Sequence, residues 1–309
     1  AIYGDGNLPA LSNEELASIR GIDPNAPQMS RLGDEPLVFN APTGPSSTAT
    51  QAAQIAETLP DDAGLMGAPG VQGTGIPTTT IDVDGGSGNP AFKNKKVREA
   101  VAHAINRKSI VENLVGPASV VIDSACHPDQ FGCTQDVKKW DYDPAKAKAL
   151  LKEAGYEKGI TTDIYAYRQR EFTEAVIGDL ANVGIQANMK FMQYRALRDL
   201  VWKGTPPIHH MTWGSNSIPD VSAITSHFFS GGRDDPAKDP KVAAALKIAD
   251  TSVDPEVRKA KYKEALEIIS SELYWLPMFT YAKYYAYGNE VDFTPTPDEI
   301  PRFYTAKWK

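Results

Sequence analysis

A loop of mixed polar and aromatic side chains follows the strand predicted at residues 208–213, and it could bind a small molecule. It opens with Trp213 and continues with Ser215, Asn216 and Asp220, which supply an aromatic face, a hydroxyl, an amide and a carboxylate. Protein sites for polar organic ligands combine such groups. Trp213 could contact a ligand or pack within its own domain. Asp220 could contact a ligand or cap the helix predicted directly after it.

Two further candidates follow other predicted strands. Arg168 comes after the strand at residues 161–167, and its guanidinium fork could bind a ligand carboxylate, although a solvated surface arginine is the commoner case. Tyr194 follows the strand at residues 185–192, and it too could contact a ligand or lie solvated on the surface. Small ligands of α/β domains bind beyond the carboxyl ends of the strands. These residues and Trp213 are therefore expected at one edge of a sheet.

Strands and helices alternate along this part of the chain. Apolar residues at helical spacing predict helices at residues 171–182 and 196–202, between the strands. This order predicts an α/β fold, with a parallel sheet and right-handed crossovers. Three more helices begin at Asp-Pro pairs, where the aspartate caps the helix and the proline takes its first position. They are predicted at residues 145–154, 241–250 and 256–273.

An amphipathic segment at residues 89–115 precedes these elements. Its first helix has an apolar stripe at helical spacing, and a second short helix is predicted at residues 109–114, ending at Gly116-Pro117. The stripe consists of Val97, Ala100, Val101, Ala104 and Ile105.

The same segment carries a sequence motif. Residues 97–110 read Val-Arg-x-Ala-x-x-x-Ala-Ile-x-Arg-x-x-Ile. This pattern resembles the helix pair of the extracytoplasmic solute-binding proteins of peptide-type ABC importers, the dipeptide/oligopeptide/nickel-binding family (solute-binding protein family 5). The resemblance runs from about residue 36 to residue 309. It implies a two-lobed architecture like that of type II periplasmic binding proteins. The lobes would close over a peptide or peptide-like solute and deliver it to a membrane permease, without catalysis and without a cofactor.

Other ligands and another class of function stay open. Within the family, the ligand could be an opine, a sugar conjugate or a metal chelate; outside it, a hydrolase with a carboxylate pair needs no local motif. In peptide-binding members the loop that matches the one at Trp213 reads Trp-x-x-Asp-x-x-Asp-Pro, and its first aspartate pairs with the α-amino group of the ligand. Asn216 takes that position here and supplies no charge, which weakens the case for a plain peptide. Asp220 could replace it.

The resemblance also divides the chain. Residues 1–88 are expected to form a partial first lobe, because only the tail of that lobe is recognisable. Residues 89–277 would form the second α/β lobe, and the aromatic, extended residues 278–309 would return to the first. Crossings between the lobes are expected near residues 84–90 and 275–281. The first lobe is assigned helices at residues 13–19 and 46–57 and strands at residues 37–39 and 78–83.

Composition limits the compartment and the partners. The chain has 309 residues, a net charge of −7 and a pI near 5.3. An acidic surface argues against nucleic acid or an anionic membrane as the partner, because both attract basic patches. A monomer is expected. The sequence opens without a leader-like segment, which for a secreted family predicts a mature or truncated chain of the periplasm or another extracytoplasmic compartment.

The two cysteines, Cys126 and Cys133, lie close together in the sequence. A disulfide is favoured over two free thiols and suits an oxidising compartment. A metal site would need more ligands than the neighbouring His127 supplies.

Two pairs of titratable residues are given structural interpretations. His209 and His210 lie on opposite faces of a strand, so one is expected in the core and one on the surface. Asp234 and Asp235 are interpreted as solvated acids of a loop.

Overall fold

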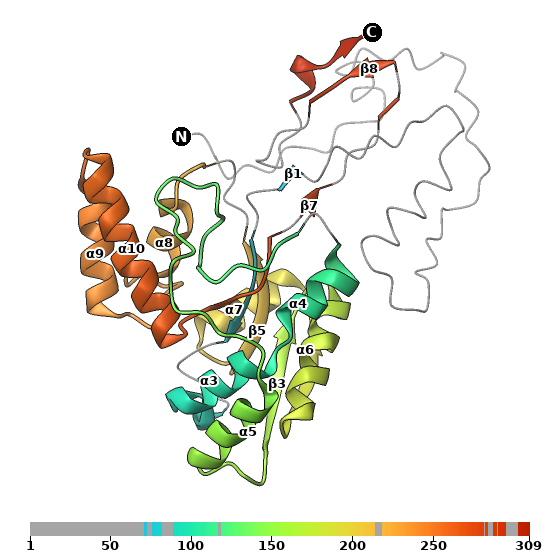
Figure 1. The fold of residues 1–309 in the computed structure, drawn as a ribbon, viewed down its shortest axis with the longest axis vertical. Helices are drawn as coiled ribbons and strands as arrows, with labels where there is room; N and C mark the ends of the chain where they lie inside the picture. The colour runs from blue at the N-terminus through green and yellow to red at the C-terminus, as the bar shows by residue number, and fades with distance from the viewer. Residues whose placement is uncertain are drawn as a thin grey trace, which may run out of the picture. The chain divides into compact units, whose positions relative to one another are not determined.

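The computed structural model describes the part of the chain that holds the predicted α/β elements, drawn as a ribbon in Figure 1. The described residues are 71–72, 76–81, 89–116, 119–213, 218–280, 282–283, 287–288, 290–294 and 302–309. The helices predicted at residues 13–19 and 46–57 and the strand predicted at residues 37–39 lie outside this part.

A mixed sheet of five strands organises the fold, in the order β4-β3-β5-β2-β6. Strand β3 runs parallel to both β4 and β5, so the parallel arrangement predicted from the alternation of strands and helices is confirmed. The strands are β2 (Ile76–Ile81), β3 (Ile160–Ala166), β4 (Ile185–Phe191), β5 (Ile208–Trp213) and β6 (Leu276–Pro277).

The strand β2 corrects one prediction. It pairs antiparallel with β5 over its whole length and with β6 at Thr78 and Thr79. This strand was expected in the first lobe, whereas it lies in the same sheet as β3, β4 and β5. Strand propensity indicates an extended segment but not its partner, and the partners here lie far away in the sequence. The first crossing was expected near residues 84–90, of which residues 84–88 lie outside the described residues.

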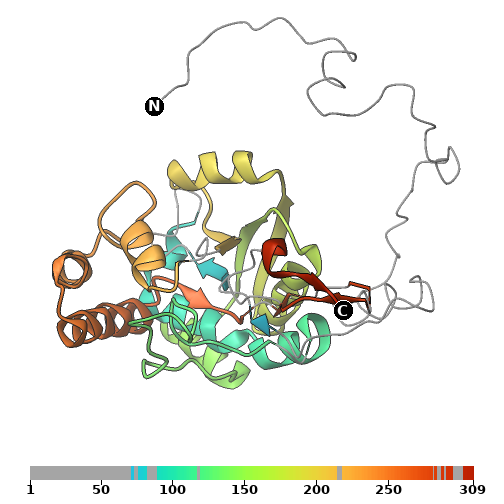
Figure 2. The same cartoon turned by 90° about the horizontal axis from the view of Figure 1, so that it is seen from above.

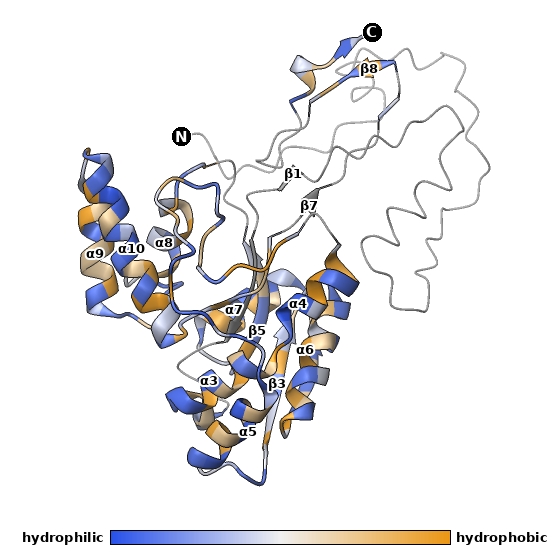
Figure 3. Cartoon of the chain, in the orientation of Figure 1, coloured by the Kyte–Doolittle hydropathy of each residue, from blue (hydrophilic) through white to orange (hydrophobic). Residues whose placement is uncertain are grey.

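Three helices share one hydrophobic core with the sheet. They are α3 (Lys95–Ala104), α5 (Pro144–Glu153) and α6 (Arg170–Asn182). The buried side chains of α3 pack with those of α5 and α6 and with residues of β3, β4 and β5. In Figure 3 these helices carry hydrophobic and hydrophilic residues in alternating patches, as expected for helices with one buried face.

A second core lies among helices from the later part of the chain. They are α8 (Ser222–Phe228), α9 (Pro240–Thr251) and α10 (Pro255–Glu272). Helix α7 (Tyr194–Trp202) lies between β4 and β5 in the sequence. Helices α9 and α10 pack side by side, and α8 packs on α9 (Figures 1 and 2). Tyr262, Leu266 and Trp275 are buried in this core.

The predicted helix starts are confirmed by their caps. The side chains of Asp143, Asp239 and Asp254 each accept a hydrogen bond from a backbone N–H of the first helical turn, at 2.7 to 2.9 Å. A proline follows each aspartate at the first helical position. These caps satisfy donors that have no partner within the helix.

The helix pair at residues 89–115 differs in detail from its prediction. Helix α3 begins after Asn94, whose side chain caps it. The second helix starts two residues early as α4 (Arg107–Ile110) and continues as a π-helical turn, η2 (Val111–Val115), that stops at Gly116 with φ 114°. A positive φ at this point suits a glycine.

Arg107 ties this helix pair to the chain around it. Its buried guanidinium donates to the carbonyls of Ile122, Trp140 and Pro277 and forms an ion pair of 2.9 Å with Asp123. Arg107, the second of the two arginines in the motif, therefore has a structural role.

Short elements complete the described part: the 3-10 turns η1 (Pro90–Lys93) and η3 (Phe303–Thr305) and four two-residue strands. Strand β1 (Val71–Gln72) pairs with β7 (Ala282–Lys283), and β8 (Val291–Asp292) pairs with β9 (Lys307–Trp308). Among the described residues, no helix is both long enough and apolar enough to cross a membrane.

Candidate ligand-binding site

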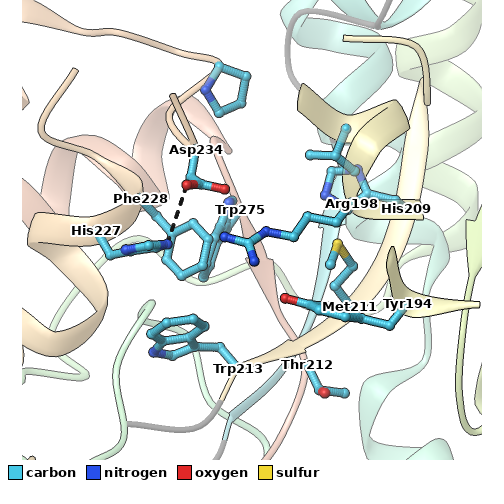
Figure 4. A pocket seen from close by; sticks show the side chains of 12 residues that line it. Tyr194, Arg198, His209, Met211, Thr212, Trp213, His227, Phe228, Asp234 and Trp275 are labelled. Atoms are coloured by element: carbon cyan, nitrogen blue, oxygen red, sulfur yellow. Dashed lines mark ion pairs between the residues drawn. The ribbon is translucent and has the colours of Figure 1, made fainter. Parts of the chain in front are cut away.

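A cavity of about 60 Å³ lies beside the carboxyl end of β5 (Figure 4). Its walls come from three elements that the sheet brings together: helix α7, strand β5 and helix α8, joined by residues near Asp234 and by Trp275. Aromatic and apolar side chains form most of the wall, with a few charged groups among them. This composition is typical of sites for small organic ligands.

Trp213 lies at the end of β5 and forms one side of this cavity. Its indole stacks on His227, with 4.9 Å between the ring centroids, and meets the edge of Phe228 at 4.8 Å. Both open interpretations of Trp213 therefore have a structural basis: part of the ring packs on α8, and part faces the cavity.

Tyr194 and Arg168 lie on the same side of the sheet end as Thr212. Tyr194 lines the cavity, and its ring lies 5.1 Å from that of Tyr167. Arg168 does not line the cavity, but its Nη1 lies 3.4 Å from the Thr212 hydroxyl, which also bonds the Tyr167 hydroxyl. The structure thus brings Tyr194 and Trp213 to one cavity and links Arg168 to it through Thr212.

Asp220 is held by the protein itself. One carboxylate oxygen accepts from the N–H of Ser222, and the other pairs with the Arg258 guanidinium at 2.9 Å. This geometry favours the interpretation of Asp220 as a cap over that of a ligand contact. Ser215 and Asn216 lie outside the described residues.

The disulfide between Cys126 and Cys133 is present, as favoured from the sequence. The loop that it closes, residues 126–133, is hydrogen-bonded to the chain that follows residue 217. Phe131 donates its N–H to Pro219 and accepts from the N–H of Val221, at 2.9 and 3.0 Å. In addition, the Gln130 side chain donates to the carbonyls of Ile218 and Asp220. These hydrogen bonds between the disulfide loop and the end of the loop at Trp213 were not predicted from the sequence.

The interpretation of the acidic pair at 234–235 as solvated is wrong. Asp235 is buried and accepts from the N–H groups of Gly231 and Lys238. Asp234 accepts from Trp202 Nε1 at 2.6 Å and lies 3.4 Å from His227 Nε2. The buried Asp235 carboxylate thus satisfies two backbone donors of the turn at residues 231–238.

The two histidines of β5 are both buried, which corrects the expectation that one lies on the surface. Helices cover both faces of the sheet here, so neither face is solvated. His210 Nδ1 bonds the Thr173 hydroxyl of α6, while His209 lines the cavity. Burial lowers the pKa of each histidine to about 4, so both rings are neutral at pH 7.

Sequence reasoning missed Arg198, which also lines the cavity. It follows Tyr194 by one helical turn, and residues four apart on a helix share a face. This spacing is the signal that could have found it. Among the described residues, no group of three or more His, Cys, Asp or Glu side chains could hold a metal ion.

Known proteins share sequence with this chain. Residues 41–236 match the family described as bacterial extracellular solute-binding proteins, family 5 Middle. The glutathione-binding protein GsiB of Salmonella choleraesuis is 31% identical over 211 residues, which cover 60% of this chain and 39% of that protein. The dipeptide-binding protein of Escherichia coli K12 is 34% identical over 134 residues, which cover 40% and 25%. The chain thus spans well under half the length of these two relatives.

A solved structure supports the fold. The dipeptide-binding protein of Pseudoalteromonas sp. SM9913, crystallised with Met-Leu, aligns with a TM-score of 0.70 at 23% identity, over 85% of this chain and 53% of that one. The α/β architecture of the type II periplasmic binding proteins, expected from the sequence, is confirmed by this likeness. Because the family match covers more than half of the chain, the protein belongs to the bacterial extracellular solute-binding proteins, family 5.

Proposed function

We propose that this protein is the substrate-binding component of an ABC importer. It captures a peptide or peptide-like small solute and delivers it to a membrane permease. The observation that carries this proposal is the aromatic cavity at the carboxyl end of β5, which both Trp213 and Tyr194 line. Family membership and the dipeptide bound to the related structure support the same ligand class. An opine, a sugar conjugate or a metal chelate is the alternative within the family.

The proposed mechanism is binding without catalysis. The Thr212 hydroxyl beside the cavity bonds the Tyr167 hydroxyl, so it is not paired with a general base as an activated nucleophile would be. Ligand contacts made only in a closed state would favour closure of two lobes, which is a population shift. No cofactor takes part, and a monomer in the periplasm or another extracytoplasmic compartment is proposed.

The lobe boundary is proposed to lie earlier than residue 88. Strand β2 belongs to the sheet with β5, and β1 pairs with β7 just outside that sheet. Along the chain, residues 73–75 join β1 to β2, and residues 278–281 join β6 to β7. We propose these segments as the crossings between the lobes.

Each candidate residue has a proposed role. Trp213 and Tyr194 contact the ligand directly, and Arg168 approaches it beside Thr212. Ser215 and Asn216 belong to the ligand loop by their position in the sequence. Asp220 positions that loop through its bonds to Ser222 and Arg258, rather than binding the ligand.

Native mass spectrometry of the freshly purified protein, beside its denatured mass, would identify a bound solute. Calorimetry with that solute then tests the site. Trp213→Ala should weaken binding at least about tenfold, the size expected for one lost aromatic contact. Trp308→Ala, in an exposed tryptophan of β9 that does not line the cavity, is the matched control. Unchanged affinity in Trp213→Ala would remove Trp213 from the site.

A further inference from the structure

We propose that the cavity beside β5 is a subsite for a carboxylate on a short arm of the ligand, and that Arg198 binds this carboxylate. The inference rests on the proposed function and narrows its ligand class to acidic peptide-like solutes. Arg198 is half-buried on α7, and its side chain lines the cavity. In Figure 4 its guanidinium reaches towards the middle of the cavity, between Tyr194 on one side and Phe228 and Trp275 on the other.

The charge around Arg198 is unbalanced. Its guanidinium carbon lies 4.3 Å from the centre of the Trp202 ring, and that of Arg233 lies 3.7 Å from the same ring. Among the described residues, neither arginine has a carboxylate within ion-pair distance. Asp234 is the nearby acid, and its oxygens are occupied by Trp202 Nε1 and by His227. Because Asp234 is already bonded, the Arg198 guanidinium has no counter-charge among the described residues, which leaves positive charge at the cavity.

His209 also lines the cavity wall and is 4% exposed. Burial lowers its pKa to about 4, so its ring is neutral at pH 7 and adds no second charge beside Arg198.

Size and polarity together select the occupant. A cavity of about 60 Å³ is far smaller than the ~300–1,000 Å³ of sites that enclose a whole small ligand. It therefore suits one short side chain of a ligand, such as that of glutamate. A purely apolar arm would take water from the Arg198 guanidinium without returning a counter-charge, which is unfavourable. A carboxylate supplies that charge, and its methylene groups can pack on Met211, Phe228 and Trp275.

The test compares ligands that differ in one group. The full chain is titrated with the dipeptides Ala-Glu and Ala-Gln and with Glu-Ala and Gln-Ala, and binding is followed by calorimetry and by tryptophan fluorescence. In at least one pair the glutamate peptide should bind about tenfold or more tightly than its glutamine partner, as expected for a charge-assisted hydrogen bond.

Variants assign the preference to one side chain. Arg198→Gln should remove the preference for glutamate, and Arg198→Lys should keep part of it because the charge remains. Arg195→Gln is the matched control: it removes the same charge from an exposed position of the same helix, outside the cavity, and should keep the preference. Circular dichroism and thermal midpoints confirm that each variant is folded.

The outcomes separate the two proposals. Binding of the peptides without a preference for glutamate, or a preference that survives Arg198→Gln, would overturn the carboxylate subsite and leave the proposed function standing. Failure of all four peptides to bind the unmodified protein would count against a peptide ligand, and the subsite would fall with it.

Discussion

Opening the disulfide between Cys126 and Cys133 should destabilise the protein and loosen the chain that leads away from the candidate ligand loop. The bridge closes a small loop, with a sequence separation of 7. Within that loop, Phe131 exchanges two backbone hydrogen bonds with the segment at residues 219–221, and the Gln130 side chain adds two more. The bridge therefore restrains the loop that holds this segment.

The expected magnitude follows from chain entropy. A separation of 7 closes a ring of eight residues. In the loop-closure relation such a ring lowers the entropy of the unfolded chain by about 8 cal/mol/K, which is about 2.5 kcal/mol at 25 °C. Removing the bridge should cost about that much unfolding free energy. Lost order at residues 219–221 would add to it.

Denaturant unfolding measures this loss. The oxidised protein is compared with the same protein under a reductant and with Cys126→Ala/Cys133→Ala. Alanine is chosen because Cys126 is fully buried and a serine hydroxyl would have to be buried with it. Alkylation of the denatured, unreduced protein should add no mass, which confirms that the bridge is present before the comparison.

Amide exchange gives a residue-level result. The Val221 N–H donates to Phe131, so its exchange should quicken when the bridge opens, while amides inside α10 should change no more than the global stability does. A loss of less than about 0.5 kcal/mol would refute the entropy argument. An unchanged Val221 exchange rate would refute the claim that the bridge restrains this segment.

Three other perturbations have defined outcomes. Arg107→Ala leaves a carboxylate and three carbonyls without their buried donor and should cost about 3 kcal/mol or more in denaturant unfolding. His209 and His210 have a folded pKa of about 4 against 6.5 unfolded, so their stabilising effect is complete above pH 6.5 and is lost towards pH 4. Between pH 6.5 and pH 4, each should lower the free energy of unfolding by on the order of 1 kcal/mol per pH unit. Unfolding midpoints measured across that window check this. Gly132→Ala places a Cβ 2.6 Å from Tyr262 at a φ of 80° and should lower the thermal midpoint.

Matched controls isolate each cause. Lys108→Ala removes an exposed charge next to Arg107 and should have little effect on stability. Gly155→Ala has a similar positive φ, 85°, but an added Cβ meets nothing, so the difference from Gly132→Ala measures the clash alone. His210→Gln should reduce the acid sensitivity; an unchanged pH profile would contradict the assignment to that histidine.

Elements held by local interactions were predictable. The helices that begin at Asp143, Asp239 and Asp254 start where the sequence places them, because an aspartate cap and a following proline act within one turn. The parallel pairing of β3 with β4 and β5 was also predictable, since a crossover helix between consecutive strands constrains their direction.

Features that depend on distant partners were not predictable in this way. The Thr-rich strand β2 is extended by its own residues, but its place between β5 and β6 is set by which edges remain free in the sheet. Asp235 and His209 look solvated or undecided in the sequence. Their burial depends on the packing of the turn at residues 231–238 and of the helices over β5.

The candidate site divides in the same way. Periodicity and motif order are properties of the chain, so they were enough to predict the α/β elements, the family resemblance, and the position of Trp213 and Tyr194 at strand ends. The fold was needed to show that Arg198 shares their cavity and that Asp220 is bonded to Arg258. Charge balance and cavity volume arise from side chains that contact one another across elements, and a linear sequence does not specify these contacts.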